Sequence, residues 1–326
     1  MAGTNNQLET GGMASTSPIE RLKVVVVTGP TAVGKTALAI ELAQRFGGEI
    51  VNADSRYLYQ GFEIGVDKPT LDERKGIPHH LIDVLPPTGE MSLARYQDLA
   101  NSAIREVAAR GRLPILTGGT PLYVNAVVEG WHIPRVPPDP DFRLQCETEA
   151  AQDGGASLMQ RLRDVDPQSA DRCGSNIRRV IRALEIFAAT GSPMSAQEGK
   201  GPRPFNTLEI GLSRPRDQLF RIIDGRIDSQ ISRGLLQEVS SLIAAGVPPT
   251  APAMSSIGYR QLLPYLEGSI SLEDALERIR FDTHRYVRHQ ETWLRKNPRL
   301  VRFDVSAEGW QSQVIAATAV FLRQEG

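Results

Sequence analysis

The sequence predicts an α/β fold, a parallel sheet flanked by helices, with an all-helical insertion domain and a helical C-terminal region. A run of four valines at 24–27 leads through a glycine-rich loop into a helical apolar repeat, and a second strand, glycine turn and helix start follow at 113–123. Between residues 142 and 190, four helical patterns succeed one another with no strand between them. The first two patterns predict the sheet, and the third predicts the insertion.

The loop after the first strand has the pattern Gly-x-x-x-x-Gly-Lys-Thr of a P-loop, so the predicted sheet is P-loop NTPase-like. Its residues are Gly29, Pro30, Thr31, Ala32, Val33, Gly34, Lys35 and Thr36. We expect its backbone N–H groups to converge on an anion at a helix N-terminus. Lys35 would contact the outer phosphates, and the Thr36 hydroxyl would hold Mg²⁺. The motif predicts a phosphate or diphosphate ligand and does not specify ATP.

A second strand begins at Glu49 and ends in the carboxylate of Asp54. Ligands of open α/β sheets bind at the carboxyl ends of the strands, so Asp54 should lie at the same edge as the P-loop. A carboxylate there can accept a proton from a nucleophile or help to position Mg²⁺. The alternative is that Asp54 only caps the segment 55–60.

A loop that contains Lys68 follows, then a strand over 77–84 and a helix over 92–110. The strand at 113–117 leads into the paired glycines Gly118 and Gly119, which permit close backbone approach. Thr120 then offers a hydroxyl beside a helix N-terminus, which predicts a second oxyanion site. A tight turn with Thr120 as a plain N-cap is the alternative.

Two proline-rich stretches, 130–141 and 198–206, mark the boundaries of the helical insertion. We therefore expect a catalytic core of residues 21–133 and 204–326, which includes the C-terminal helices, and an insertion domain of residues 134–203. The polar segment 1–20 lacks the charged start and apolar stretch of a secretory signal, so we interpret it as a disordered tail.

After a strand at 208–212, helical patterns cover 216–226, 235–245, 256–266 and 272–297. Cations are concentrated in the last of these: Arg278, Arg280, His284, Arg285, Arg288, His289, Arg295 and Lys296. Tyr286 and Trp293 lie among them, a combination typical of a surface that follows a phosphate backbone. A solvated helix face is the alternative, because acidic residues partly alternate with these cations.

The composition fits a globular protein: the chain has 326 residues, of which 40% are hydrophobic and 23% charged. A net charge of −1 means that any nucleic-acid surface must be a local basic patch. The two cysteines, Cys146 and Cys173, lack metal-ligand spacing, which argues against zinc and fits a reducing compartment. No apolar run approaches the roughly 20 residues that cross a bilayer. We expect a cytoplasmic monomer without membrane association.

These motifs resemble those of the tRNA dimethylallyltransferases, also called tRNA isopentenyltransferases. The matching pieces are GPTAVGKT at 29–36, NADSRYLY at 52–59, a KPT ending at 70, IPHHLID at 77–83, GGTPLY at 118–123, RRVIRALE at 178–185, IGYRQ at 257–261 and QETWLR at 290–295. They occur in family order between about residue 24 and residue 297. Together they are highly specific, whereas the P-loop alone is not.

The resemblance implies transfer of a dimethylallyl group from dimethylallyl diphosphate to N6 of the adenosine next to the anticodon of tRNA, with release of diphosphate. The P-loop would hold the diphosphate, with Lys35 and Mg²⁺-bound Thr36 among its contacts. Asp54 resembles the general base, and Thr120 the residue that contacts the bridging oxygen of the leaving group. Arg226 is the expected helix contact to diphosphate, with Arg221 as the alternative.

The resemblance also implies a set of tRNA-binding positions. They are Asp54, Ser55, Arg56, Tyr57, Thr120, Arg143, Arg178, Arg179, Arg182, Ser255, Gly258, Tyr259, Arg260, Arg285, Arg288 and Gln290. A flipped adenine that approaches an allylic carbon, and a departing diphosphate that needs cations, fit these positions.

Three departures from the family pattern stand out. Val66 and Asp67 replace a usual Thr-Ala, which adds a negative charge near the diphosphate. His289 weakens one tRNA contact, and Ile222 stands where an arginine is frequent. The zinc-binding tail of the eukaryotic cytosolic relatives is missing from the sequence, which indicates a bacterial-type enzyme.

Two other classes of protein would also use the P-loop. A kinase for a small metabolite needs the phosphate loop and Asp54, but it gives no reason for the 118–120 turn or for the basic last helix. A nucleotide-dependent RNA-binding switch would leave Asp54 and Thr120 without a role. The sequence therefore favours the transferase.

Overall fold

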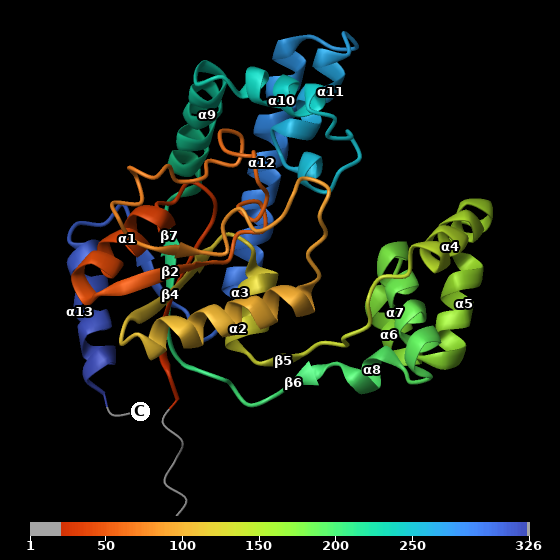
Figure 1. Cartoon of the computed structure of the whole chain (residues 1–326), viewed down its shortest axis with the longest axis horizontal. Coiled ribbons are helices and arrows are strands. Elements are labelled where there is room, and N and C mark those ends of the chain that lie inside the picture. The colour runs from red at the N-terminus through yellow and green to blue at the C-terminus, as the bar shows by residue number, and fades with distance from the viewer. Residues whose placement is uncertain (1–20, 325–326) are drawn as a thin grey trace, which may run out of the picture.

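A computed structural model describes residues 21–324 of the chain. The predicted tail of residues 1–20 lies outside the described residues. Figure 1 shows a sheet with helices on both sides, a group of helices beyond one edge of it, and a smaller set of helices set apart from both. Among the described residues, no helix combines the length and the apolar character needed to cross a membrane.

Six parallel strands form the sheet in the order β3-β2-β4-β1-β7-β8. Their bounds are β1 (Lys23–Thr28), β2 (Gly48–Asn52), β3 (His79–His80), β4 (Leu113–Gly118), β7 (Asn206–Ser213) and β8 (Val301–Asp304). Strands β2 and β4 are buried along their whole length. Helices cover both faces of such a sheet, so its strands are continuously apolar rather than alternating. The sheet confirms the predicted fold class.

Helices α1 and α13 lie on one side of the sheet and α2 and α3 on the other (Figure 1). Their bounds are α1 (Lys35–Phe46), α2 (Leu93–Ala109), α3 (Pro121–Val128) and α13 (Trp310–Arg323). In the register of the sheet, Thr28 of β1 lies beside Gly118 of β4. The P-loop and the glycine turn therefore leave the sheet at the same edge, the one formed by the carboxyl ends of the strands.

A group of C-terminal helices stands beyond this edge (Figure 1). It comprises α9 (Arg216–Ser232), α10 (Leu235–Ala244), the short 3₁₀ helix η1 (Ala253–Ser255), α11 (Tyr259–Leu266) and α12 (Leu272–Arg295). Helix α12 packs on α9 and α11, and one part of it reaches α3 beside the sheet. This long helix thus connects the C-terminal group to the edge that carries the P-loop.

The segment between residues 133 and 198 forms its own apolar cluster, which includes Cys146, Leu158, Leu162, Val180 and Leu184. Its helices are α4 (Pro140–Asp153), α5 (Ala156–Val165), α6 (Pro167–Cys173), α7 (Ile177–Thr190) and α8 (Met194–Gln197). The chain enters through β5 (Trp131–His132) and returns through β6 (Gly199–Lys200), which pair in antiparallel fashion. The segment 134–203 is therefore not wholly helical, because β6 lies within it.

Other stretches outside the insertion also differ from the sequence predictions. The predicted strand at 77–84 is reduced to two residues, because Leu81 and Asp83 adopt positive φ angles of 62° and 58° that end the extended backbone. Strand β8 and helix α13 were not predicted individually. Strand β8 is a short edge strand with three exposed residues, so its sequence carries little apolar signal.

Candidate active site

The P-loop joins β1 to α1, as its sequence predicts. A Cβ atom at Gly29 would lie 2.8 Å from the carbonyl oxygen of Leu212, so this close approach needs glycine. Gly34 precedes α1 with a φ of 103°, which a side chain would strain. The Lys35 ammonium donates a hydrogen bond to the Pro30 carbonyl over 2.7 Å. Burial lowers the pKa of Lys35 to about 8, although the nearby Asp54 carboxylate partly counters this effect.

Asp54 follows β2, where its backbone N–H donates to the side-chain oxygen of Asn52 over 2.9 Å. Its Oδ1 accepts the N–H of Arg56 over 3.0 Å. Asp54 therefore does cap the segment that follows it, as the alternative interpretation held, but that segment begins with a turn and not a helix. Its Oδ2 faces the glycine turn: a Cβ atom built on Gly119 would lie 3.1 Å from it and 3.7 Å from the Lys35 nitrogen. One carboxylate oxygen is thus held and the other is directed toward the site.

The glycine turn brings β4 against the end of β2. A Cβ atom at Gly118 would lie 2.1 Å from the carbonyl carbon of Ala53, which excludes any side chain. Thr120 occupies the N-cap position of α3, but its hydroxyl makes no capping bond. It instead accepts the N–H of Ser55 over 3.0 Å. The hydroxyl is therefore held beside Asp54, which disfavours the plain N-cap alternative.

Helix α12 links the two loops through Gln290, whose side chain is 2% exposed. Its amide oxygen accepts the N–H of Thr31 over 2.9 Å, and its amide nitrogen donates to the Gly119 carbonyl over 2.7 Å. The hydroxyl of Tyr286 donates to the same carbonyl over 2.9 Å. Gln290 lies on the same buried face of α12 as Ile279 and Val287. This helical spacing is the one feature of the sequence that could have indicated a buried position for Gln290.

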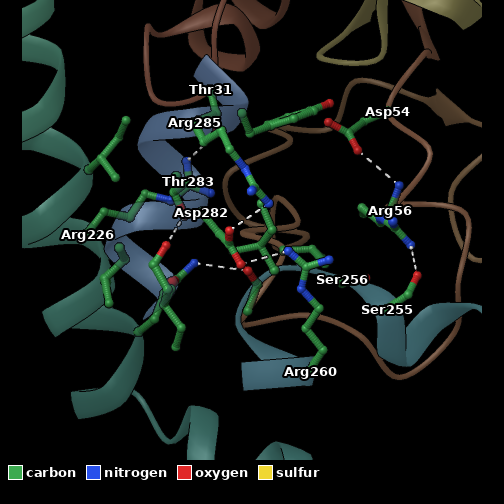
Figure 2. Close-up of a pocket in the computed structure, with 18 of the residues that line it drawn as sticks. Thr31, Asp54, Arg56, Arg226, Ser255, Ser256, Arg260, Asp282, Thr283 and Arg285 are labelled. Atoms are coloured by element: carbon green, nitrogen blue, oxygen red, sulfur yellow. Dashed lines mark hydrogen bonds and ion pairs between the residues drawn. The ribbon is translucent and has the colours of Figure 1, made fainter. Parts of the chain in front are cut away.

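Two cavities meet at this edge. The P-loop cavity, of about 550 Å³, is lined by Lys35 and Thr36 among others. The arginine cavity, of about 600 Å³, is lined by Arg56, Arg226, Arg260 and Arg285, which come from four different elements. Figure 2 shows Arg226 and Arg56 entering the arginine cavity from opposite sides. Both cavities are lined by Thr31, Asp54, Val66 and Arg226.

Hydrogen bonds hold the arginines of the arginine cavity. Arg56 donates to the Ser255 hydroxyl over 3.2 Å. Arg260 and Arg285 contact the two carboxylate oxygens of Asp282, over 2.8 and 2.9 Å. Asp54 therefore lies where a lysine-containing phosphate loop on one side and a cationic cavity on the other converge.

The profile of a protein family described as IPP transferase matches residues 57–297 of the chain. This chain belongs to that family. It is 54% identical over 307 residues to a protein of Thermomicrobium roseum named tRNA dimethylallyltransferase, with 94% of this chain and 93% of that relative covered. A protein of a Roseiflexus species with the same name is 48% identical over 300 residues, covering 92% and 98% of the two chains.

Solved structures of the family are similar along nearly the whole chain. The tRNA isopentenylpyrophosphate transferase of Bacillus halodurans superposes with a TM-score of 0.70 at 36% identity, covering 94% of this chain and 98% of that one. A eukaryotic dimethylallyltransferase described as acting on tRNA gives a TM-score of 0.77 at 29% identity, covering 93% and 81%. These matches confirm the resemblance inferred from the motifs.

Arg226 and Arg221, the two candidate contacts to diphosphate, lie in different surroundings. Arg226 lines both cavities, and its Nη1 lies 3.5 Å from the Thr31 hydroxyl. Arg221 has a side chain that is 73% exposed and pairs with Asp217 on the same helix. Arg233, which the sequence reasoning missed, also lines the P-loop cavity. It lies about two turns beyond the end that the sequence predicts for this helix, Arg226, so there was no local signal for its role.

The tRNA-binding positions implied by the resemblance fall into three groups. Eight of them line one or both cavities: Asp54, Ser55, Arg56, Tyr57, Thr120, Ser255, Arg260 and Arg285. Arg288 is exposed on α12 outside the lining of either cavity, and Gly258 precedes α11. The remaining group lies in the insertion or in the core.

Four of the implied tRNA-binding arginines lie in the insertion, and two of these four have structural partners there. Arg143 makes two hydrogen bonds, of 2.8 and 3.0 Å, to the buried carboxylate of Glu185, and Arg182 contacts the same carboxylate. Arg178 and Arg179 line a separate pocket of the insertion. For Arg178 and Arg179, which have no such ion pair among the described residues, the tRNA contact stays a prediction.

Two predicted tRNA contacts need correction. Tyr259 is fully buried, and its hydroxyl contacts the Glu238 carboxylate. Gln290 uses its whole amide group to join the P-loop to the glycine turn. Neither side chain has a surface for RNA, so both act in the architecture of the site.

Proposed function

We propose that this chain transfers the dimethylallyl group of dimethylallyl diphosphate to N6 of the adenosine next to the anticodon in tRNA, giving N6-isopentenyladenosine and diphosphate. The observation that carries the proposal is the position of Asp54 at the junction of the two cavities. The P-loop cavity suits the diphosphate, and the arginine cavity suits the backbone around a flipped nucleotide. Family membership points to the same reaction.

In this reaction the adenine nitrogen forms a bond to the allylic carbon while the bond from that carbon to the bridging oxygen breaks. The electron pair leaves with the diphosphate, and Asp54 Oδ2 accepts the proton that the amino group loses. This acceptor matters because the amino lone pair is delocalised into the ring, which makes the nitrogen a poor nucleophile. Thr120 would donate its hydroxyl hydrogen to the bridging oxygen as negative charge develops there.

Lys35, Arg226 and the P-loop amides would stabilise the departing diphosphate. The Thr31 N–H donates to the Gln290 side chain and is therefore occupied, so this bond fixes the loop conformation in which the remaining P-loop N–H groups are presented. Preorganised donors of this kind act on charge that appears only in the transition state. They therefore lower the barrier without requiring the site to rearrange.

Thr36 is the residue that we propose for Mg²⁺. Its hydroxyl belongs to the lining of the P-loop cavity beside Lys35, and oxygen donors together with substrate phosphates are the usual Mg²⁺ ligands. The ion would neutralise part of the diphosphate charge. Lys35, Arg226 and the loop amides would position the same group from the protein side.

The test is to incubate the protein with dimethylallyl diphosphate, Mg²⁺ and unmodified tRNA, then digest the tRNA and weigh its nucleosides by mass spectrometry. We expect one adenosine to gain a five-carbon unit with stoichiometric release of diphosphate. A parallel reaction with ATP in place of the prenyl donor should leave the ATP intact. A phosphorylated product without a five-carbon increment would support the kinase and overturn the transferase.

A further inference from the structure

Asp67 joins two arginines across the mouth of the P-loop cavity. Its Oδ2 lies 2.8 Å from Nε of Arg226, and its Oδ1 lies 2.6 Å from Nη2 of Arg233. The three side chains all line this cavity, together with Lys35. In the sequence, Asp67 stood out only as an added negative charge near a diphosphate site.

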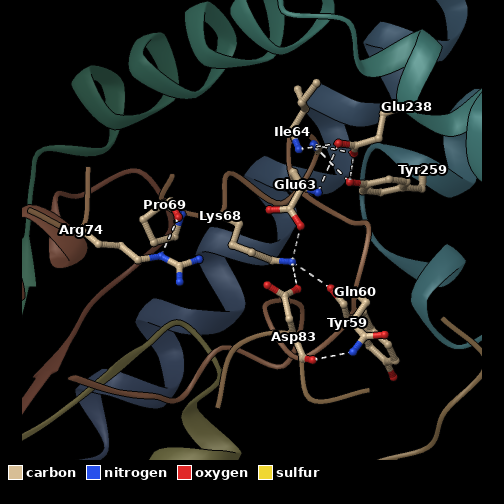
Figure 3. A network of polar contacts seen from close by, with 11 residues as sticks. Tyr59, Gln60, Glu63, Ile64, Lys68, Pro69, Arg74, Asp83, Glu238 and Tyr259 are labelled. Carbon is tan, nitrogen blue, oxygen red and sulfur yellow. Dashed lines mark hydrogen bonds and ion pairs between the residues drawn. The ribbon is translucent and has the colours of Figure 1, made fainter. Parts of the chain in front are cut away.

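The loop that carries Asp67 is fastened from two directions. The Glu238 carboxylate of α10 accepts the backbone N–H groups of Glu63 and Ile64, over 3.2 and 2.8 Å. Lys68, whose side chain is fully buried, donates to the Tyr59 carbonyl over 2.8 Å and pairs with Glu63 and Asp83 (Figure 3). Lys68 therefore fixes the loop and does not point its charge at the diphosphate.

The backbone of Asp67 itself is also held. Its φ of 59° lies in the left-handed region, which aspartate and asparagine tolerate better than most residues. The hydroxyl of Tyr57 donates to its carbonyl oxygen over 2.8 Å. The carboxylate thus occupies a fixed point, and the two arginines, which come from α9 and the residue that follows it, are drawn to it.

The contacts of Asp67 leave part of each guanidinium available. Arg226 contacts Asp67 through Nε, and its Nη1 lies 3.5 Å from the Thr31 hydroxyl in the lining of both cavities. Arg233 is held by Nη2 alone. A guanidinium has five N–H donors in a planar fork that matches phosphate oxygens. Both arginines can therefore contact a diphosphate while they remain bound to Asp67.

Two opposite effects of the Asp67 charge have to be weighed. As an isolated anion it would repel a diphosphate. As a bridge it brings two cations to the same side of the cavity, where their mutual repulsion would otherwise separate them, and it restricts two long side chains that have many rotamers. The bridged group of two arginines and one carboxylate keeps a net charge of +1, so it still attracts a diphosphate while the carboxylate fixes its geometry.

We propose that Asp67 is a positioning residue that holds Arg226 and Arg233 as a paired clamp, and that Arg233 is a further ligand of the donor's diphosphate. Ile222, where the resemblance implies an arginine, lines the same cavity without a charge. Arg233, at the C-terminal end of α9, supplies a guanidinium to this cavity instead. The proposal rests on the proposed function for the identity of the diphosphate-bearing donor.

The decisive variant is Asp67→Asn, because asparagine keeps the shape, tolerates the positive φ and leaves the Tyr57 bond to the backbone intact. We expect the KM for dimethylallyl diphosphate to rise about 10-fold, the scale of one lost charge-assisted hydrogen bond, with kcat within about twofold. Affinity for tRNA should stay unchanged. If the carboxylate acts only by repulsion, the same variant will lower the KM for the donor, which would overturn the clamp.

Arg233→Ala and Arg233→Lys test the second half of the proposal. We expect both to raise the KM for the donor, since lysine keeps the charge but loses the planar fork. Asp67→Asn combined with Arg233→Ala should be much less than additive, because both remove the same contact. Unchanged donor KM in Arg233→Ala, or full additivity in the double variant, would exclude Arg233 as a ligand held by Asp67.

The pair formed by Asp217 and Arg221 on α9 provides matched controls, because it is an exposed carboxylate and arginine outside both cavities. Asp217→Asn and Arg221→Ala should leave donor KM unchanged.

Calorimetric measurement of inorganic pyrophosphate binding distinguishes failure of the clamp proposal from failure of the proposed function. A parent enzyme that prenylates tRNA while Asp67→Asn binds pyrophosphate normally would refute the clamp alone. A parent that binds pyrophosphate through the clamp but forms no prenylated adenosine would refute the function alone.

Discussion

Asp54 has one carboxylate oxygen engaged by the Arg56 amide and the other directed at the Gly119 turn and Lys35. This division lets the residue keep its place while one oxygen accepts a proton. General-base catalysis typically contributes about 10²–10⁴-fold, so Asp54→Asn should lower single-turnover alkylation by a factor in that range. Binding of tRNA should remain, because the amide keeps the shape of the side chain. Parental turnover combined with lost tRNA affinity would make Asp54 a binding residue.

In the proposed reaction, Thr120 would act on the opposite side from Asp54, at the leaving oxygen. Thr120→Ala removes one hydroxyl that already contacts Ser55, and it should slow alkylation by about 10-fold or more through the loss of one hydrogen bond to developing charge. Single-turnover rates with pre-bound tRNA measure this effect. Thr120→Ser, which keeps the hydroxyl, is the control and should recover most of the rate.

Lys35 gives the reaction a predictable pH dependence. Burial lowers its pKa to about 8, so free enzyme loses this positive charge as the pH rises through about 8. Bound diphosphate favours the protonated form and raises the pKa again. We expect kcat/KM for the donor to fall above about pH 8, while kcat at saturating donor stays level to higher pH. The Lys35→Arg variant should be slower, but its kcat/KM for the donor should not fall above about pH 8. If kcat/KM still falls in this variant, another group is responsible for the titration.

At the scale of elements, α12 connects the two loops of the site through a single side chain. Gln290→Leu leaves the Thr31 N–H and the Gly119 carbonyl without this partner, so the free energy of unfolding should drop by about 1–3 kcal/mol. The KM for the donor should rise because the P-loop loses a bond that fixes its conformation. Calorimetry and steady-state kinetics measure the two effects. Weakened tRNA binding with unchanged stability and donor KM would return Gln290 to the RNA interface.

The opposite face of α12 carries the predicted RNA contacts. Arg285 lines the arginine cavity, whereas Arg288 is exposed beyond it. Replacing both with alanine should weaken tRNA binding and reduce its salt dependence, with each lost phosphate contact lowering the slope by roughly one. Titrations of tRNA at several salt concentrations give this slope. Equal affinity at every salt concentration would place both residues on a solvated face.

At the scale of the molecule, the parts that could be predicted from sequence are those encoded by short-range pattern. The P-loop, the Gly118 turn and four of the five insertion helices follow from glycine positions and apolar periodicity. Gln290, Asp67 and Arg233 could not be placed, because their partners are distant in the chain and only the folded sheet edge brings them together. The roles of Arg143 and Arg182 were hidden for the same reason, since a buried carboxylate binds both.

The short β5–β6 pairing has a consequence for how the chain tolerates change in length. It holds His132 and Gly199 side by side, and the intervening residues pack around an apolar cluster of their own. The entropy of closing a loop grows only with the logarithm of its length, so residues added or removed inside that loop cost the sheet little. The insertion can therefore vary in size while the strands that carry Asp54 and Thr120 keep their register.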